Sequence, residues 1–218
     1  MNVEENLPVT DEVVEAARAL SASQISDALA ELHLPSHSMD GIVTLELSAK
    51  VVGLAFTVTC LPAAESEGQR IEYLGDIPAG AVVVISNGGR TDCSVWGGQR
   101  TLAARQRGAV GSVVDGAFRD IPEHIELRYP VFARKRVVLG SRGYANPVRT
   151  QEPVTMSGLT VHPGDLIVGD ASGVVVLPAA RAAEVIEIAT REAAIESRVA
   201  AAVAAGVDFF EAKAAAAQ

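Results

Sequence analysis

Three charged residues lie close together near the middle of the chain: Arg119, Asp120 and Glu123. An arginine guanidinium can bind a carboxylate through two parallel hydrogen bonds. An aspartate can bind a hard cation such as Mg²⁺ or Mn²⁺, which keeps several waters and takes only one or two protein carboxylates. The same residues would also suit a local ion pair or a helix cap, so their types alone leave both interpretations open.

A pair of glycines, Gly97-Gly98, precedes these residues at the expected start of a helix. The free backbone N–H groups and the positive dipole end at such a position favour an anion, for instance a substrate carboxylate. Glycine also lets a ligand approach the backbone closely. A plain tight turn would use the same two residues, so an anion site is one of two interpretations.

A buried strand is predicted to deliver Arg119 and Asp120 to a loop. The apolar run 110–114 stops at Asp115-Gly116, a dipeptide that is typical of a turn. Loops at the ends of strands are where binding and catalytic groups gather. The sequence therefore places the charged residues where a site is expected.

The rest of the chain alternates between strand and helix patterns. Strand, helix and strand in succession predict a parallel βαβ unit with a right-handed crossover. Closely spaced turn residues further along predict antiparallel strands. The pattern indicates an α/β fold with mixed sheets, a single domain over 1–218 and a C-terminal helical segment over about 178–218. The predicted elements are helices 11–20, 21–34, 96–107 (with Leu102, Ala103 and Ala104 inward) and 178–205, a frayed tail after Gly206, and strands 51–61, 81–86, 110–114, 131–133, 136–139, 158–168 and 173–177.

Composition limits the partners and the location. Apolar residues make up 49% of the chain and aromatic residues 4%, so the core must be built from Val, Ala, Leu and Ile. The formal net charge of −9 argues against nucleic acid as the main partner, because phosphate binding needs a basic face. The acidic N-terminus lacks a signal-peptide pattern and no apolar run is long enough for a membrane span, so we expect a cytoplasmic protein. Cys60 and Cys93 are expected as buried or half-buried unpaired thiols.

Other catalytic chemistries find little support in the sequence. The histidines show no metal-ligand spacing and are expected on the surface or in turns, and His124 is the one nearest the charged residues. No lysine lies at the end of an apolar strand, where a Schiff-base amine would be expected. No nucleophile elbow, P-loop or dinucleotide fingerprint is present.

The order of these motifs resembles that of the RraA-like family. In that family a glycine, twenty further residues, Arg-Asp, two residues and an acid recur, and Gly98, Arg119-Asp120 and Glu123 stand at that spacing. Further segments match from about Ser21 to Gly206, namely SQISDAL at 23–29, GLAFT at 53–57, AVGSVVDG at 109–116, PVFAR at 130–134, GD at 164–165 and GDASGVVV at 169–176.

The resemblance implies a three-layer swivelling β/β/α domain that assembles as a homotrimer or homohexamer, with the site between subunits. The family includes metal-dependent class II aldolases that cleave 4-hydroxy-4-methyl-2-oxoglutarate and 4-carboxy-4-hydroxy-2-oxoadipate to pyruvate and a second keto acid, and that also decarboxylate oxaloacetate. It further includes proteins that bind and inhibit ribonuclease E. The resemblance therefore implies either a divalent-metal-dependent carbon–carbon lyase or a non-catalytic protein-binding regulator.

Carried over residue by residue, the resemblance also implies roles in the site. Asp120 would bind Mg²⁺ or Mn²⁺ directly, and Arg119 would hold the substrate and stabilise the developing enolate. An acid from the C-terminal helix of a neighbouring subunit would join the outer water shell of the metal, with Glu196 the best match and Glu192 next. The substrate carboxylate would be held by the backbone around Gly97, Gly98, Gln99 and Arg100.

Two positions depart from the aldolase pattern. Gly98 stands where well-characterised aldolases have an acid that positions a catalytic water, and Ser172 stands where many members have aspartate. The loss of a proton-handling acid costs roughly 10²–10⁴-fold in rate. Gly98 therefore favours an altered reaction, such as simple decarboxylation, or the regulator function, whereas the intact Arg119, Asp120 and Glu123 favour the lyase.

Overall fold

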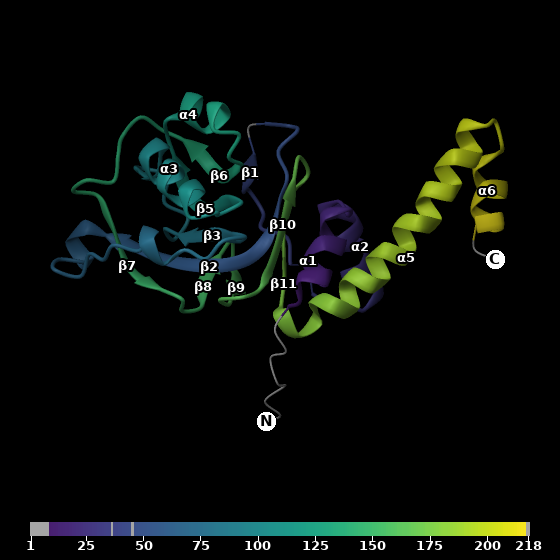
Figure 1. Cartoon of the computed structure of the whole chain (residues 1–218), viewed down its shortest axis with the longest axis horizontal. Coiled ribbons are helices and arrows are strands. Elements are labelled where there is room, and N and C mark those ends of the chain that lie inside the picture. Colours follow the sequence, from purple (N-terminus) through teal and green to yellow (C-terminus); the bar gives the residue numbers. More distant parts are fainter. Residues whose placement is uncertain (1–8, 36, 45, 217–218) are drawn as a thin grey trace.

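The structure, a computed structural model, describes residues 9–35, 37–44 and 46–216. Its main sheet runs in the order β1-β6-β5-β3-β2-β10-β11, with β4 beside β5 and β7 beside β2, and it curls into a nearly closed, barrel-like form (Figure 1). The strands are β1 (Val43–Thr44), β2 (Val51–Pro62), β3 (Ala81–Ser86), β4 (Ser94–Trp96), β5 (Gly111–Phe118), β6 (Val131–Arg136), β7 (Ala145–Thr150), β10 (Leu166–Asp170) and β11 (Gly173–Leu177).

The centre of this sheet is parallel and its flanks are antiparallel. β2, β3, β5 and β6 pair in parallel, as the predicted βαβ unit requires. β10 pairs antiparallel with β11, as the closely spaced turns predicted, and it also pairs antiparallel with β2. A small separate hairpin joins β8 (Val154–Met156) to β9 (Leu159–Val161). The expected α/β class with C-terminal helices is confirmed.

Side-chain alternation along the central strands creates two cores. In β3, Val83 and Ile85 belong to the cluster that faces α3 (Gly98–Gln106), whereas Val82 and Val84 belong to the cluster inside the curled sheet. Successive side chains of a strand point to opposite faces, so a strand covered on both faces must be apolar throughout. All six residues of β3 and all eight of β5 are buried accordingly.

The N-terminal helices begin where the sequence predicts. Thr10 Oγ1 accepts a hydrogen bond from Val13 N at 3.4 Å and caps α1 (Asp11–Arg18). Ser21 and Gln24 form a reciprocal capping box at the start of α2 (Ala22–Glu31). Both helices pack with α5 (Ala179–Ala204) against the β10–β11 end of the sheet.

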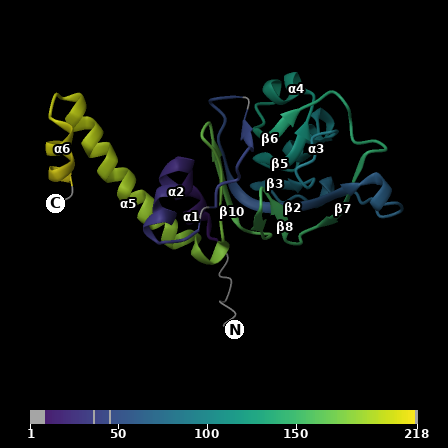
Figure 2. The same ribbon diagram turned by 180° about the vertical axis from the view of Figure 1, so that it is seen from behind.

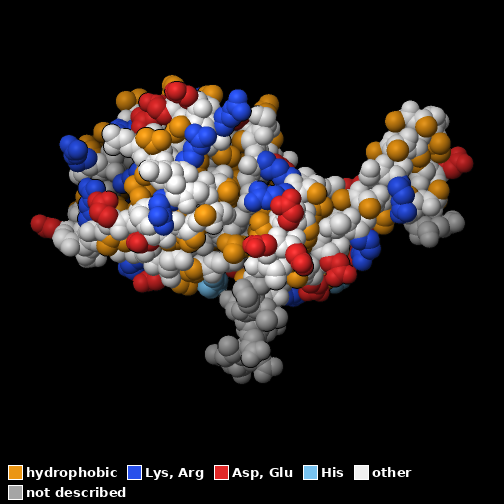
Figure 3. Space-filling view, viewed as in Figure 1, with side chains coloured by type: hydrophobic (Ala, Val, Ile, Leu, Met, Phe, Trp, Pro, Cys, Tyr) orange, Lys and Arg blue, Asp and Glu red, His pale blue; other side chains and the backbone are white. Residues whose placement is uncertain are grey.

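The C-terminal helices form an arm that projects from the sheet. α5 runs away from the body, and α6 (Phe209–Ala216) folds back beside its far end (Figures 1 and 2). The tail after Gly206, predicted as a partly frayed helix end, forms α6, which packs on α5 and buries Ala212. Hydrophobic side chains lie on the surface of the arm's end, where Phe209 and Phe210 are exposed (Figure 3). Within the described residues, no helix is long and apolar enough to span a bilayer.

Two predicted boundaries near the charged residues were also wrong. Trp96 belongs to β4 rather than to a helix, and α3 begins at Gly98; its Leu102 is 58% exposed, whereas Ala104 is buried as predicted. The strand predicted over 136–139 is not formed, because β6 ends at Arg136 and Val138 lies on the surface.

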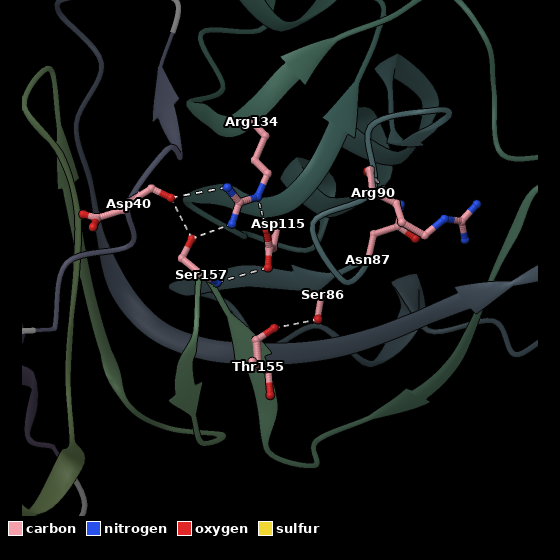
Figure 4. Close-up of polar contacts among 8 residues, drawn as sticks. All are labelled: Asp40, Ser86, Asn87, Arg90, Asp115, Arg134, Thr155 and Ser157. Carbon is pink, nitrogen blue, oxygen red and sulfur yellow. Dashed lines mark hydrogen bonds and ion pairs between the residues drawn. The ribbon is translucent and has the colours of Figure 1, made fainter.

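The strand that delivers the charged residues is longer than predicted. β5 continues through Asp115-Gly116 to Phe118, because the Asp115 carboxylate finds buried partners instead of forming a turn. The Asp115 carboxylate pairs with the Arg134 guanidinium and accepts a hydrogen bond from Ser157 N at 3.1 Å (Figure 4). Arg134 Nη2 donates to Ser157 Oγ at 2.9 Å, and that hydroxyl donates to the Asp40 carbonyl at 2.9 Å.

Candidate functional site

Two parallel strands bring the predicted glycines and charged residues together. β4 pairs with β5 in parallel, with Trp96 opposite Phe118, so the segments that leave these strands are adjacent. Arg119 N donates to the Trp96 carbonyl at 3.1 Å, and Gly98 N donates to Asp120 Oδ2 at 3.0 Å. The start of α3 therefore lies against the turn between β5 and α4 (Ile121–Glu126).

Asp120 has a left-handed backbone conformation, with φ 62° and ψ 49°. Aspartate is one of the few non-glycine residues that tolerate this region, at a cost of about 1–3 kcal/mol. The conformation brings Oδ2 to the N-terminus of α3, where the dipole favours a negative charge, and to 3.4 Å from Arg119 Nε. Both of these contacts are made by Oδ2, and the Asp120 side chain is 34% exposed.

Three glycines permit this close packing. A Cβ atom on Gly97 would lie 2.6 Å from Asp120 Oδ2, and a Cβ on Gly140 would lie 2.7 Å from Arg119 Nη1. A Cβ on Gly98 would lie 3.2 Å from both Cβ and Cγ of Glu123. A side chain at position 98 would therefore require the Glu123 side chain to shift by a few tenths of an ångström.

The site opens into a cavity of about 510 Å³, a size typical of small-molecule sites. Its charged lining consists of four arginines and one aspartate, a formal balance of +3 in a chain whose net charge is −9. Among the predicted residues, the lining includes Gly97, Gln99, Arg100, Arg119 and Asp120. Arg70 and residues from 139–143 and 145–147 also line the cavity.

A second, shallower hollow adjoins this cavity and shares part of its wall. It measures about 600 Å³, and both Gly98 and Glu123 line it. Arg119 and Asp120 line both hollows and so stand between them. Both acidic residues of the motif, Asp120 and Glu123, thus line the second hollow.

A divalent cation suits these donors better than a soft metal. No group of three His, Cys, Asp or Glu side chains that could hold a metal occurs among the described residues. Mg²⁺ needs no such cage, because one or two carboxylates and several waters satisfy it. Asp120, whose side chain is 34% exposed, is the carboxylate of the site that could hold such a cation.

His124 is buried next to the site, contrary to the prediction that it would be a surface or turn residue. The residue is 5% exposed, and its ring nitrogens lie 2.9 Å from Thr101 Oγ1 and 2.7 Å from the Arg119 carbonyl. Burial lowers the pKa of His124. Nothing in the local sequence indicates Thr101 as its partner, because the contact depends on the packing of α3 against α4.

The predicted outer-shell acids do not join the site within one chain. Glu196 accepts a hydrogen bond from Gln24 Nε2 at 2.8 Å, and Glu192 pairs with Arg191 Nε at 3.1 Å. Both lie on α5, on the opposite side of the molecule from α3 and α4 (Figures 1 and 2). Ser172 lies in the exposed turn between β10 and β11, where its N–H donates to Asp170 Oδ1 at 2.8 Å.

The fold and the site define a class of mixed α/β proteins with an arginine-lined cavity at the ends of parallel strands. The chain belongs to the RraA-like family, described as Aldolase/RraA, whose pattern matches residues 22–176. Comparison with known proteins thus confirms the family to which the sequence motifs pointed.

Two curated relatives show how far the likeness extends. A protein of Halalkalibacterium halodurans named "Putative 4-hydroxy-4-methyl-2-oxoglutarate aldolase" is 32% identical over 179 residues, which cover 81% of each chain. Protein DlpA of Legionella pneumophila is 32% identical over 190 residues, 85% of this chain. The chain spans only about a third (31%) of the length of DlpA.

Two solved structures share the fold over most of this chain. An uncharacterized protein from Pseudomonas syringae is 35% identical, with a TM-score of 0.87 over 95% of this chain and 99% of that one. RraAS2 of Streptomyces coelicolor, described as an unusual member of the RNase ES inhibitor RraA protein family, is 28% identical. Its TM-score is 0.80 over 86% of this chain and 96% of its own.

Proposed function

We propose that the chain is a divalent-metal-dependent carbon–carbon lyase that acts on a short 2-keto acid of the 4-hydroxy-4-methyl-2-oxoglutarate type. It would release pyruvate and a second keto acid, and it would also decarboxylate oxaloacetate. The observation that carries the proposal is the placement of Arg119 and Asp120 at one helix N-terminus, open to a cavity with a positive balance of charge. Such a cavity suits a substrate that bears carboxylates.

The substrate would be held by its carboxylate. Gly98 N already donates to Asp120, so the first-turn N–H groups of Gln99 and Arg100 remain for the ligand. Arg119 would pair with the substrate and stabilise the negative charge that develops on the keto oxygen as the carbon–carbon bond breaks. Mg²⁺ or Mn²⁺ at the Asp120 carboxylate would supply Lewis-acid chemistry to the same oxygen.

The two reactions place different demands on the chain. Aldol cleavage requires removal of the proton from the 4-hydroxyl group, whereas decarboxylation of oxaloacetate removes CO₂ and needs no base at that carbon. Gly98 offers no acid or base. We therefore expect oxaloacetate decarboxylation to be the faster of the two activities.

The test is release of pyruvate from oxaloacetate and from 4-hydroxy-4-methyl-2-oxoglutarate with Mg²⁺ or Mn²⁺ present. We expect turnover that a chelator abolishes and added metal restores. The absence of turnover with any short 2-keto acid in the presence of metal would contradict the lyase proposal.

A homo-oligomer, either a trimer or a hexamer, is part of the proposal. Because Glu196 lies far from Asp120 within one chain, it would reach the site only from a neighbouring copy. The exposed apolar end of the C-terminal arm is compatible with such an assembly.

A protein-binding regulator of the ribonuclease E type is the alternative function. The similarity to the Streptomyces protein and the glycine at position 98 favour it. Capture of ribonuclease E that the Asp120→Ala variant performs equally well, without turnover of keto acids, would support this alternative.

A further inference from the structure

A buried chain of hydrogen bonds ends on the backbone just before Asp120. The Thr101 hydroxyl, on α3, lies 2.9 Å from His124 Nδ1, and His124 Nε2 lies 2.7 Å from the Arg119 carbonyl. Thr101 is fully buried and His124 nearly so. The contacts therefore connect the second turn of α3 to the turn that carries the candidate metal ligand.

The direction of these bonds follows from the groups involved. A carbonyl oxygen can only accept, so His124 Nε2 must carry a proton and donate to Arg119. In the neutral ring Nδ1 then accepts, and the Thr101 hydroxyl donates to it. Burial lowers the pKa of His124, which favours this neutral form.

The peptide groups of Arg119 are thereby fixed on both sides. Arg119 N donates to the Trp96 carbonyl at 3.1 Å, while the Arg119 carbonyl accepts from His124. The next residue, Asp120, has the unfavourable left-handed conformation. Such a conformation persists only where the surrounding structure determines it.

We propose that Thr101 and His124 are positioning residues that hold the Arg119–Asp120 turn and thereby keep the Asp120 carboxylate at the start of α3. The inference rests on the proposed function to the extent that this carboxylate is the metal ligand. Outer-shell partners of a metal ligand typically change metal affinity by about 10–100-fold when they are removed.

The test uses the full chain with four substitutions. His124→Phe keeps an aromatic ring and removes both hydrogen bonds, whereas His124→Gln retains a donor and an acceptor. Thr101→Val removes only the hydroxyl. Ser112→Ala is the matched control, because it removes a buried hydroxyl that lies 3.0 Å from Tyr129 Oη. Ser112 lies in β5, the strand that leads to the Arg119–Asp120 turn, but outside the turn itself.

Two measurements report on the turn, and global stability is measured alongside. The exchange rate of the Gly98 amide in metal-free protein reports on its bond to Asp120, and titration with Mn²⁺ gives the metal affinity. We expect His124→Phe to speed Gly98 exchange about tenfold or more and to weaken Mn²⁺ binding roughly 10–100-fold. Thr101→Val should have a smaller effect, His124→Gln should recover most of the loss, and Ser112→Ala should leave both quantities unchanged.

Two results would overturn the inference. One is a His124→Phe protein whose Gly98 exchange and Mn²⁺ affinity match the wild type. The other is an equal change in Ser112→Ala at equal global stability, which would indicate general loosening of the core. If the wild-type chain does not bind Mn²⁺, the proposed function fails, and Gly98 exchange in the metal-free protein still decides the positioning role.

Discussion

At the scale of single residues, Asp120 combines two requirements that few side chains meet. It adopts a left-handed conformation, and it presents a negative oxygen to the cavity. Asparagine meets the first requirement and can still accept from Gly98 N, but it carries no charge. A comparison of aspartate with asparagine at position 120 therefore distinguishes the role of this residue in the backbone turn from its role as a metal ligand.

We predict that Asp120→Asn keeps the stability of the wild type but loses metal-dependent activity by about 10²-fold or more, since the ligand charge is gone. Mn²⁺ titration and pyruvate release measure the loss, and urea unfolding measures the stability. Asp120→Ala should lose activity and also about 1 kcal/mol of stability, because alanine does not tolerate the left-handed region. Full activity in Asp120→Asn would contradict the assignment of Asp120 as metal ligand.

Gly97 offers a steric test of the same site. In Gly97→Ala the added methyl group would lie 2.6 Å from Asp120 Oδ2, so the carboxylate must move away from α3. We expect a loss of activity of about tenfold or more, measured as kcat, with the chain still folded. Gly75→Ala is the control, because a Cβ there meets no atom within 4 Å; equal activity in both variants would show that the carboxylate's position is unimportant.

The burial of His124 leads us to predict that the free energy of unfolding depends on pH. Burial lowers its pKa below the ordinary value of 6.5, so the unfolded chain binds this proton more readily than the folded chain. The contribution of His124 to stability is therefore fully present at neutral pH and is lost as pH falls below 6.5. Urea unfolding of metal-free protein should show the wild type losing more stability on acidification than His124→Gln, and parallel curves for the two proteins would contradict this.

At the scale of secondary-structure elements, the ion pair of Asp115 and Arg134 fixes the strand that carries the site. It ties β5 to β6, and through Ser157 it reaches the β8–β9 hairpin and the Asp40 loop (Figure 4). Asp115 is almost fully buried, so removal of its partner leaves a carboxylate with an incomplete set of hydrogen bonds.

We predict that Arg134→Met lowers the free energy of unfolding by about 2–4 kcal/mol, toward the low end for a buried ion pair because Arg134 is partly exposed. Urea unfolding measures the change. The double variant with Asp115→Asn should be less destabilised than the sum of the two single variants, because the unpaired charge is gone. Additive losses would indicate that the two side chains act independently.

The same ion pair shows why the sequence predicted some elements and not others. The continuous apolar runs of β3 and the caps at Thr10 and Ser21 are local signals, and they predicted their elements correctly. Asp115-Gly116 also gives a local turn signal, but its partner Arg134 lies 19 residues away and overrides that signal. His124 was misplaced for the same reason, since its burial depends on the contact between two helices.

At the scale of the whole molecule, the candidate site and the C-terminal arm lie on opposite sides (Figure 1). The adjacency of the glycines and the Arg-Asp pair was expected from the family resemblance, and the parallel pairing of β4 with β5 explains it physically. No spacing in the sequence could reveal that Glu196 lies far from Asp120 within one chain. That separation makes a shared site a testable property of the assembly.

We predict that inactive Asp120→Ala chains and impaired Glu196→Ala chains restore activity when they are mixed under conditions that exchange subunits. If a site takes Asp120 from one chain and Glu196 from a neighbour, random mixing in equal amounts rebuilds about a quarter of the sites with both residues intact. Pyruvate release from the mixture, compared with each variant alone, measures this recovery, and light scattering gives the oligomeric state. A parallel mixture with Glu192→Ala in place of Glu196→Ala tests the second candidate. If neither mixture is more active than the average of its two components, α5 of a neighbouring copy supplies neither acid.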